Sequence, residues 1–263
     1  MTNYQPITKT EFAKKSWQRS PNYMFTSKDQ VCELGVTELP AAMMSMPLAF
    51  LCTNGEYSVA AVQGLEHESN FYVGADGKWR GRYIPASYRG HPFILASNKA
   101  SKENLILCID TDSNHLIHDD TADPFFDKYG ELSAKIGEIM EFLTGVTRGL
   151  KAAARICEVL LKHDLFMPWE LELESELDSP PKRVEGLFCI NEAIFKELSD
   201  EAHGELRRAG AIHVIYCQLL SMQNISSLKQ FAKENSKLNL AAEHEELYLH
   251  GAGSDGNINF DNL

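Results

Sequence analysis

The feature that most constrains the fold is a change of hydrophobic period near residue 130. Between Glu131 and His163, apolar residues recur three or four positions apart, which predicts one apolar stripe on a long helix. Thr144-Gly145 is the place where this helix is expected to break, if it is two helices rather than one. The stripe consists of Ile136, Ile139, Met140, Leu143, Val146, Leu150, Ala154, Cys157, Leu160 and Leu161.

The residues before this point form short strand-like segments separated by turn signals. The apolar segment Leu48–Cys52 predicts a strand that ends at Asn54-Gly55, a strong hairpin signal. Further strands are predicted at Tyr57–Val62, Asn70–Val73, Trp79–Ile84 and Leu105–Ile109. We therefore expect an α+β fold, in which an N-terminal small antiparallel β-sheet or partial barrel precedes a mainly helical C-terminal half.

Beyond the long helix, extended and helical patterns alternate. Glu170–Asp178 alternates leucine with carboxylates and predicts a strand, as does Val184–Ile190. Helices are expected from a cap at Asn191 to Leu198, from Ser199 or Asp200 to Arg208 with Gly210 as a stop, over Ile212–Met222, and from Ser226 onward. We expect an N-terminal extension at 1–16, a β-rich half at 17–130, a mainly helical half at 131–241 packed with it as one unit, and a flexible acidic tail at 242–263.

Charge and hydropathy limit the partners. The formal net charge of −12 argues against a nucleic-acid partner, which requires a basic face. The longest nearly apolar run, Ala41–Cys52, is too short for the roughly 20 residues of a membrane span, so we do not expect an integral membrane protein. Met1–Lys15 lacks the apolar core of a signal peptide, which favours a cytoplasmic location. The six cysteines contain no CxxC pair and are expected to be buried free thiols.

One stretch has the composition of a recognition surface or of a rigid structural corner. Residues 79–93 hold four aromatics, three arginines, two prolines and a histidine. Aromatic rings bury area, while guanidinium groups bind carboxylates through two parallel hydrogen bonds. For Trp79, Tyr83 and Phe93, a place in the core or at a structural corner is favoured over a ligand cage. The candidate binding residues are Trp79, Arg82, Tyr83, Arg89, His91 and Phe93.

A weaker hypothesis is a metal site. His118 and Asp120 form the H-x-D pattern that opens the facial triad of iron oxygenases, and a distal ligand would be His163, His203 or His213. We otherwise predict no cofactor, with iron or zinc as the alternative.

Two further sequence motifs lack the residues or elements that their binding sites require. Asp110, Asp112 and Asn114 match the start of an EF-hand loop, but His115 stands where that loop needs glycine, so an Asx turn is the better prediction. The residues 251–256 spell GxGxxG without the strand and helix that a dinucleotide site needs.

The order of several motifs resembles the SapC family from about Trp17 to Leu228. In the first half the resemblance rests on Trp17, Tyr23, Phe25, Glu38, Ala41-Ala42, Pro47–Phe50, Gly64-Leu65, Asn70, Asp76–Trp79, Tyr83–Ala86, Arg89, Pro92-Phe93, Cys108–Asp110, Phe126-Asp127 and Gly130. In the second half it rests on Gly186-Leu187, Ile190–Glu192, Leu198, Leu206–Ile212, Tyr216, Leu219–Met222, Asn224 and Leu228. Asn191 and Gly90-His91 depart from what the family often has.

The resemblance implies an association with bacterial surface layers and no defined chemistry. The family is named for a surface-layer locus beside secretion genes, and its members tend to sit near genes for TonB-dependent receptors, tryptophan-halogenase-like proteins and cupin-like proteins. No catalytic residues are established for it.

Three functions remain open. The first is a cytoplasmic accessory protein that recognises a peptide or protein segment in surface-layer export or outer-membrane uptake, with the residues of the 79–93 stretch as anchors. The second is a metal-dependent enzyme that modifies a peptide or small molecule. The third, a structural surface-layer subunit, is disfavoured because no export signal is visible at the N-terminus. Self-association into a homo-oligomer also stays open.

Overall fold

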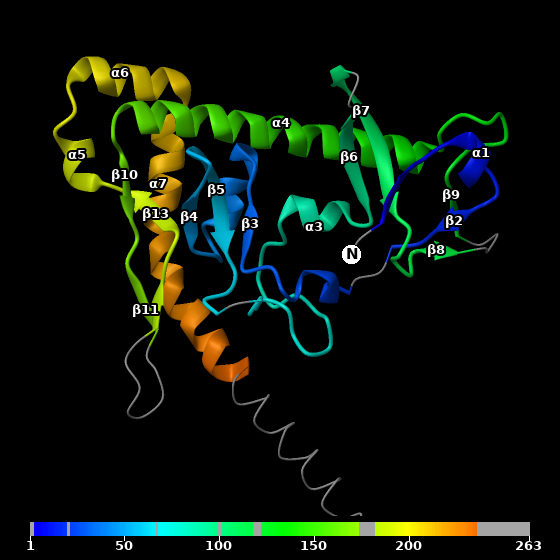
Figure 1. The fold of residues 1–263 in the computed structure, drawn as a ribbon, viewed down its shortest axis with the longest axis horizontal. Coiled ribbons are helices and arrows are strands. Elements are labelled where there is room, and N and C mark those ends of the chain that lie inside the picture. The colour runs from blue at the N-terminus through cyan, green and yellow to red at the C-terminus, as the bar shows by residue number, and fades with distance from the viewer. Residues whose placement is uncertain are drawn as a thin grey trace, which may run out of the picture.

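The structure is a computed structural model that describes residues 3–19, 22–66, 68–98, 101–117, 122–173 and 182–235. Small antiparallel sheets precede a helical C-terminal region, so the predicted α+β class is confirmed. The parts are arranged along one long helix, with the larger sheet beneath one end of it and two of the three smaller sheets at the other end (Figure 1).

The largest sheet has five strands, each antiparallel to its neighbours. Their spatial order is β10 (Phe166–Pro168), β13 (Leu187–Ile190), β4 (Leu48–Thr53), β5 (Glu56–Val62) and β3 (Val31–Glu33). The central hairpin β4–β5 turns through Asn54 and Gly55, whose φ angles of 53° and 84° suit a two-residue turn. The hairpin predicted from these two residues is confirmed.

Three smaller sheets complete the β structure. The first has the order β1 (Tyr4–Pro6), β7 (Ser101–Asp110), β6 (Phe93–Asn98); the second has the order β8 (Leu116–Ile117), β2 (Ser16–Trp17), β9 (Asp123–Pro124); the third pairs β11 (Leu171–Leu173) with β12 (Lys182–Val184). The predicted strand at Leu105–Ile109 is therefore confirmed as part of β7.

The long helix α4 (Ala134–Lys162) connects two hydrophobic cores. Its first half buries Ile136 in a core with Phe93 and Phe125, and its second half buries Leu160 in the larger core over the five-stranded sheet. At 1.5 Å per residue, its 29 residues span about 43 Å. The predicted break at Thr144-Gly145 does not occur, because packing against the two cores holds both halves in one helix.

The remaining helices are short. The α-helices are α1 (Lys9–Phe12), α2 (Leu39–Ala42), α3 (Ala86–Gly90), α5 (Glu192–Lys196), α6 (Asp200–Ala209) and α7 (Ala211–Ser221). The 3₁₀ turns are η1 (Met24–Thr26), η2 (Val36–Glu38) and η3 (Met222–Asn224). Residues 225–235 are also helical. Asn191 and Ser199 cap α5 and α6 through their side-chain oxygens, and Gly210 ends α6. These caps and this stop are as predicted.

Two predicted strands, Asn70–Val73 and Trp79–Ile84, are wrong. Val73 and Trp79 form only an isolated bridge. The backbone bonds here are those of turns, such as the Gly74 amide to the Lys78 carbonyl at 2.9 Å. Side chains add to them: the Tyr72 amide donates to the Asn70 side chain at 3.0 Å, and the Trp79 indole donates to the Tyr83 carbonyl at 2.8 Å. The segment is a set of turns around buried rings.

Other predictions are met in part. Gly186, at a φ of 84°, separates β12 from β13, so Val184–Ile190 is not one strand. Of the strand predicted at Glu170–Asp178, Leu171–Leu173 form β11, and residues 174–181 and the tail from 242 lie outside the described residues. The Asx turn at Asp110 is confirmed, since the Asp112 amide donates to its carboxylate at 3.1 Å.

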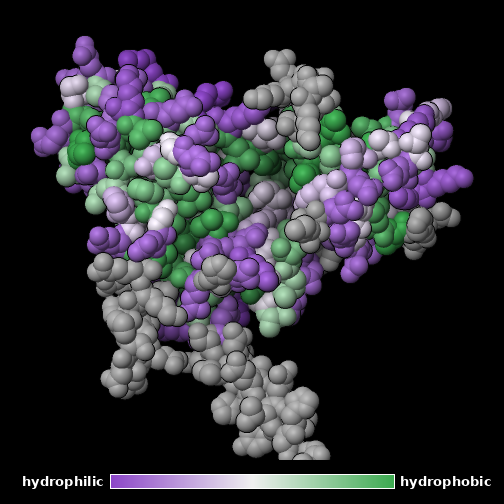
Figure 2. Space-filling model, in the orientation of Figure 1, coloured by the Kyte–Doolittle hydropathy of each residue, from purple (hydrophilic) through white to green (hydrophobic). Residues whose placement is uncertain are grey.

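All six cysteines are free, and all except the exposed Cys52 are buried. Among the described residues, no helix has both the length and the apolar character needed to cross a membrane. On the face shown in Figure 2, hydrophobic residues are visible beneath α4 in the middle of the molecule, whereas hydrophilic residues cover α6.

Candidate functional site

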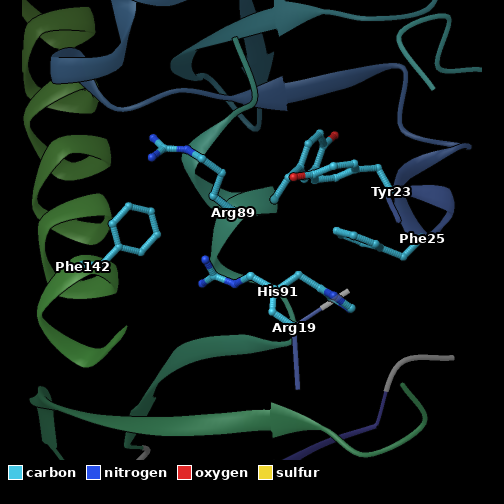
Figure 3. A pocket seen from close by; sticks show the side chains of 7 residues that line it. Arg19, Tyr23, Phe25, Arg89, His91 and Phe142 are labelled. Atoms are coloured by element: carbon cyan, nitrogen blue, oxygen red, sulfur yellow. The ribbon is translucent and has the colours of Figure 1, made fainter. Parts of the chain in front are cut away.

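Two cavities meet beside α3. The first, which we call the arginine cavity, has a volume of about 300 Å³ and is lined by Arg19, Tyr23, Phe25, Tyr88, Arg89, His91 and Phe142. These residues come from the segment after β2, from the start of η1, from α3 and the residue following it, and from α4. In Figure 3, Arg19 and Arg89 extend toward the helix that carries Phe142, and Tyr23, Phe25 and His91 form the opposite side.

A buried carboxylate supports this site from behind. Glu38 is 7% exposed, and its Oε1 accepts hydrogen bonds from the Tyr83 hydroxyl at 2.8 Å and the Ala86 amide at 2.7 Å. Its Oε2 accepts from the Gly35 amide at 2.9 Å. Three donors satisfy one charge, so Glu38 ties η2 to the first residue of α3.

Tyr83 links Glu38 to Arg89 through two hydrogen bonds. Burial and the neighbouring Glu38 raise the pKa of Tyr83 to about 12, so its hydroxyl stays protonated and donates to Glu38. The Arg89 Nη2 donates to the Tyr83 oxygen at 3.3 Å, and its Nε donates to the Ile84 carbonyl at 3.1 Å. These contacts fix one edge of the guanidinium, and the other N–H donors remain for a ligand.

Aromatic faces flank the same guanidinium. Its central carbon lies 5.2 Å from the Phe142 ring centroid and 5.6 Å from that of Tyr83. Such contacts hold a cation without neutralising it. Within the described part of the chain, neither Arg89 nor the exposed Arg19 has a carboxylate partner. The cavity is therefore positively charged.

His91 forms an uncharged wall of the cavity. Its ring stacks on Phe25 at a centroid separation of 3.7 Å, and its Nε2 lies 3.8 Å from the Asp110 carboxylate. Burial, together with the nearby His115, lowers the pKa of His91 to about 4 although Asp110 acts in the opposite direction. The ring is neutral at pH 7.

Tyr88 closes the floor. Its hydroxyl donates to the Gln63 side chain at 2.8 Å, and burial raises its pKa above the ordinary value. Its ring meets Phe25 edge-on at 6.0 Å. The floor is thus uncharged, which leaves the two arginines as the charged groups of the cavity.

The second cavity, which we call the α4 groove, has a volume of about 840 Å³ and shares Arg89 and Phe142 with the first. It lies between η2, α2, α3 and α4. Its lining residues are Val36, Thr37, Glu38, Ala41, Tyr83, Ala86, Arg89, Glu138, Glu141, Phe142, Gly145, Val146, Arg148, Gly149 and Ala152. The two cavities adjoin at these two shared side chains.

The structure divides the residues of the 79–93 stretch. Tyr83, Arg89 and His91 line a cavity, whereas Phe93 is 1% exposed and lies in the core against Trp17. Trp79 stacks on Tyr72 at 5.5 Å and lies behind Tyr83, so its place is that of a structural corner. Arg82 is exposed and lines neither cavity.

Sequence reasoning did not select Arg19, Tyr23, Phe25 or Phe142. Tyr23 and Phe25 are among the residues that carry the family resemblance, which is the one signal that marks them. Arg19 and Phe142 have no motif, and they reach the site only because β2 and α4 are brought together in the fold.

The structure does not test the two central ligands of the proposed metal site. His118 and Asp120 lie outside the described residues. In the parts of the chain that are described, no group of three His, Cys, Asp or Glu side chains is placed to hold a metal ion. Of the distal candidates, His163 lies 3.1 Å from Glu205, His203 packs against the Phe195 ring, and His213 lies 3.9 Å from the Cys217 sulfur.

Comparison with known proteins gives a family. The family model named SapC matches residues 7–228. No curated protein and no solved structure matches the chain. Because the match covers most of the sequence and includes every residue of both cavities, the chain belongs to the SapC family.

Proposed function

We propose that this protein binds a peptide or protein segment through a carboxylate, which the arginine cavity receives. The observation that carries the proposal is the convergence of Arg19 and Arg89, both without a carboxylate partner in the described residues, on one aromatic-walled cavity. An arginine fork matches a carboxylate through two parallel hydrogen bonds, and the neighbouring rings offer apolar area to the rest of the ligand.

The charge of the whole chain supports a carboxylate rather than a dianion. A net charge of −12 repels anions at long range, and a doubly charged phosphate is repelled about twice as strongly as a carboxylate. The neutral His91 adds no positive charge at pH 7 to offset this. The neighbouring rings of Tyr23, Phe25 and Phe142 suit the side chain and backbone that accompany a peptide carboxylate.

The biological setting we propose is that of an accessory protein in the cytoplasm that serves surface-layer export or outer-membrane uptake. Membership of the SapC family supports this setting, since the family takes its name from a surface-layer locus. The segment recognised would then belong to a protein or peptide handled by that system.

Affinity selection with peptide pools tests the proposal. The immobilised protein is exposed to randomised tetrapeptides with a free C-terminal carboxylate, with an aspartate or glutamate and an amidated C-terminus, and with no carboxylate at all. We expect retention of a carboxylate-bearing pool over the last one, and the first two pools separate a terminal from a side-chain carboxylate. Equal retention of all three pools would contradict the proposal.

Two arginine variants locate the binding. Arg19→Ala removes an exposed side chain that has no partner among the described residues, so the fold should survive. We expect it to weaken binding about tenfold, the effect of losing a hydrogen bond to a charged group. Arg82→Ala is the matched control, because it removes the same charge from outside both cavities. Equal losses in the two variants would indicate non-specific attraction.

A further inference from the structure

The α4 groove adjoins the arginine cavity at Arg89 and Phe142, which line both. A ligand that contacts these two side chains from the arginine cavity therefore lies next to the groove along α4. The arginine cavity, at about 300 Å³, is large enough for a terminal residue, whereas the groove is nearly three times larger. A single amino acid would leave the groove unfilled.

The floor of the groove is shaped by glycine. A Cβ added to Gly145 would meet nothing within 4 Å, so the helix surface there is open to the groove. Farther along, Gly149 lies so close to Gly35 that an added Cβ would be 3.3 Å from its Cα, which brings η2 against α4 and closes the floor. The groove is therefore a channel along one face of α4, and the contact between Gly35 and Gly149 forms part of its floor.

Its length and lining fit an extended chain. From Phe142 to Ala152 the helix rises about 15 Å, which an extended peptide covers with four or five residues. Val36, Ala41 and Val146 supply aliphatic contacts along it. The charged lining residues of the groove are of both signs: Glu38, Glu138 and Glu141 are acidic, and Arg89 and Arg148 are basic.

We propose that the ligand is an extended peptide of about five residues, whose carboxylate lies in the arginine cavity and whose preceding residues lie in the α4 groove over Gly145. The inference rests on the proposed function and deepens it, because it makes the ligand a segment rather than a single residue. Gly145 is a specificity-determining position: a side chain there would occupy the space that the peptide needs.

Two probes separate the inference from the proposed function. N-acetyl-leucine fills the arginine cavity alone, and acetyl-Ala-Val-Ala-Ala-Leu with a free carboxylate also reaches into the groove. We expect calorimetry to give the pentapeptide at least tenfold tighter binding than N-acetyl-leucine. Equal affinities would overturn the inference and leave the proposed function standing, whereas failure of both probes to bind would overturn the two together.

The glycine variants supply the matched comparison. Gly145→Leu places a side chain in the groove, and Gly137→Leu places the same side chain on the same helix, also with nothing within 4 Å of its Cβ, but outside both cavities. We expect Gly145→Leu to abolish the advantage of the pentapeptide, with N-acetyl-leucine affinity within twofold of wild type. Gly137→Leu should change neither. If Gly145→Leu keeps the advantage, the peptide does not follow the groove.

Discussion

The Tyr83 hydroxyl donates a 2.8 Å hydrogen bond to the buried carboxylate of Glu38, and this pair couples the β-rich part of the chain to the candidate site. Tyr83 also accepts a hydrogen bond from Arg89. The orientation of the Arg89 guanidinium therefore depends on Glu38, which does not line the arginine cavity. Glu38 is thus a positioning residue for the arginine cavity.

The first prediction concerns this carboxylate. Glu38→Gln keeps the shape but turns one acceptor oxygen into a donor, which faces the amide of Gly35 or the donors Tyr83 and Ala86. We expect the free energy of unfolding to fall by about 2 kcal/mol, as measured by urea denaturation. Glu131→Gln, at an exposed position, is the control and should change it little. A Glu38→Gln protein as stable as wild type would show that the three bonds contribute nothing net.

The second prediction concerns pH. The pKa of His91 is about 4 in the folded protein, against 6.5 for an unperturbed histidine. Between these two pH values the unfolded chain binds more protons than the folded one, so the free energy of unfolding rises with pH through this window. The contribution of His91 is fully present above about pH 6.5. On acidification through the window, His91 lowers the free energy of unfolding by at most about 1.4 kcal/mol per pH unit.

His91→Phe isolates this contribution because it keeps a ring on Phe25 and removes the titrating group. Urea denaturation from pH 4 to 7 gives the free energy of unfolding of both proteins as a function of pH. We expect this free energy to rise more steeply with pH in wild type than in the variant. Parallel curves would show that His91 titrates normally in the folded protein.

The third prediction concerns the only exposed thiol among the six cysteines. Burial raises the pKa of Cys32 and of Cys157 to about 12 and that of Cys108, Cys189 and Cys217 in the same direction. The thiolate is the reactive form, so Ellman's reagent should label one thiol rapidly in the native protein and six in denaturant. Cys52→Ser should remove the rapid phase and leave five thiols in denaturant. A second rapid thiol would indicate local opening of a core.

Local signals in the sequence predicted the elements that local chemistry determines. Asn54-Gly55 predicts the β4–β5 turn because both residues tolerate positive φ, and the stripe from Ile136 to Leu161 predicts α4 because one face is apolar throughout. The strands at Asn70–Val73 and Trp79–Ile84 were mispredicted because side-chain hydrogen bonds there outweigh β propensity.

The site was predictable only in part, because it depends on tertiary contacts. The composition of the 79–93 stretch marked Tyr83, Arg89 and His91, which line the cavities. Nothing local links Arg19 to Phe142, which lie 123 positions apart in the sequence and share the arginine cavity. For Phe93, the sequence favoured the core or a corner although the residue was also a candidate for binding, and the structure places Phe93 in the core.

The fourth prediction concerns a buried amide between two strands. β4 and β13 pair at Phe50 and Phe188 but diverge toward Leu48 and Ile190, and the Gln218 side chain of α7 fills the gap. It accepts from the Ile190 amide at 3.1 Å and donates to the Leu48 carbonyl at 3.2 Å. Gln218→Leu leaves both backbone groups buried without these partners, so we expect a loss of about 2–4 kcal/mol in the free energy of unfolding.

Gln223→Leu is the matched control, since it makes the same change at an exposed position one half-turn beyond α7. It should alter stability by less than about 0.5 kcal/mol. Similar losses in the two variants would mean that leucine is unfavourable in this helix for reasons unrelated to the strands, and the bridging role of Gln218 would be wrong.

The last prediction concerns the contact that joins η2 to α4. Replacing a glycine inside a helix by alanine usually stabilises a protein by about 1 kcal/mol. We expect this gain for Gly137→Ala, because the added Cβ meets nothing within 4 Å. Gly149→Ala places a Cβ 3.3 Å from the Cα of Gly35, whose amide is held by Glu38 and is not free to retreat. We expect Gly149→Ala to be at least about 1 kcal/mol less stable than Gly137→Ala in thermal and urea unfolding. Equal gains in both variants would show that η2 moves away from α4 without cost, and that the floor of the groove at Gly149 is not rigid.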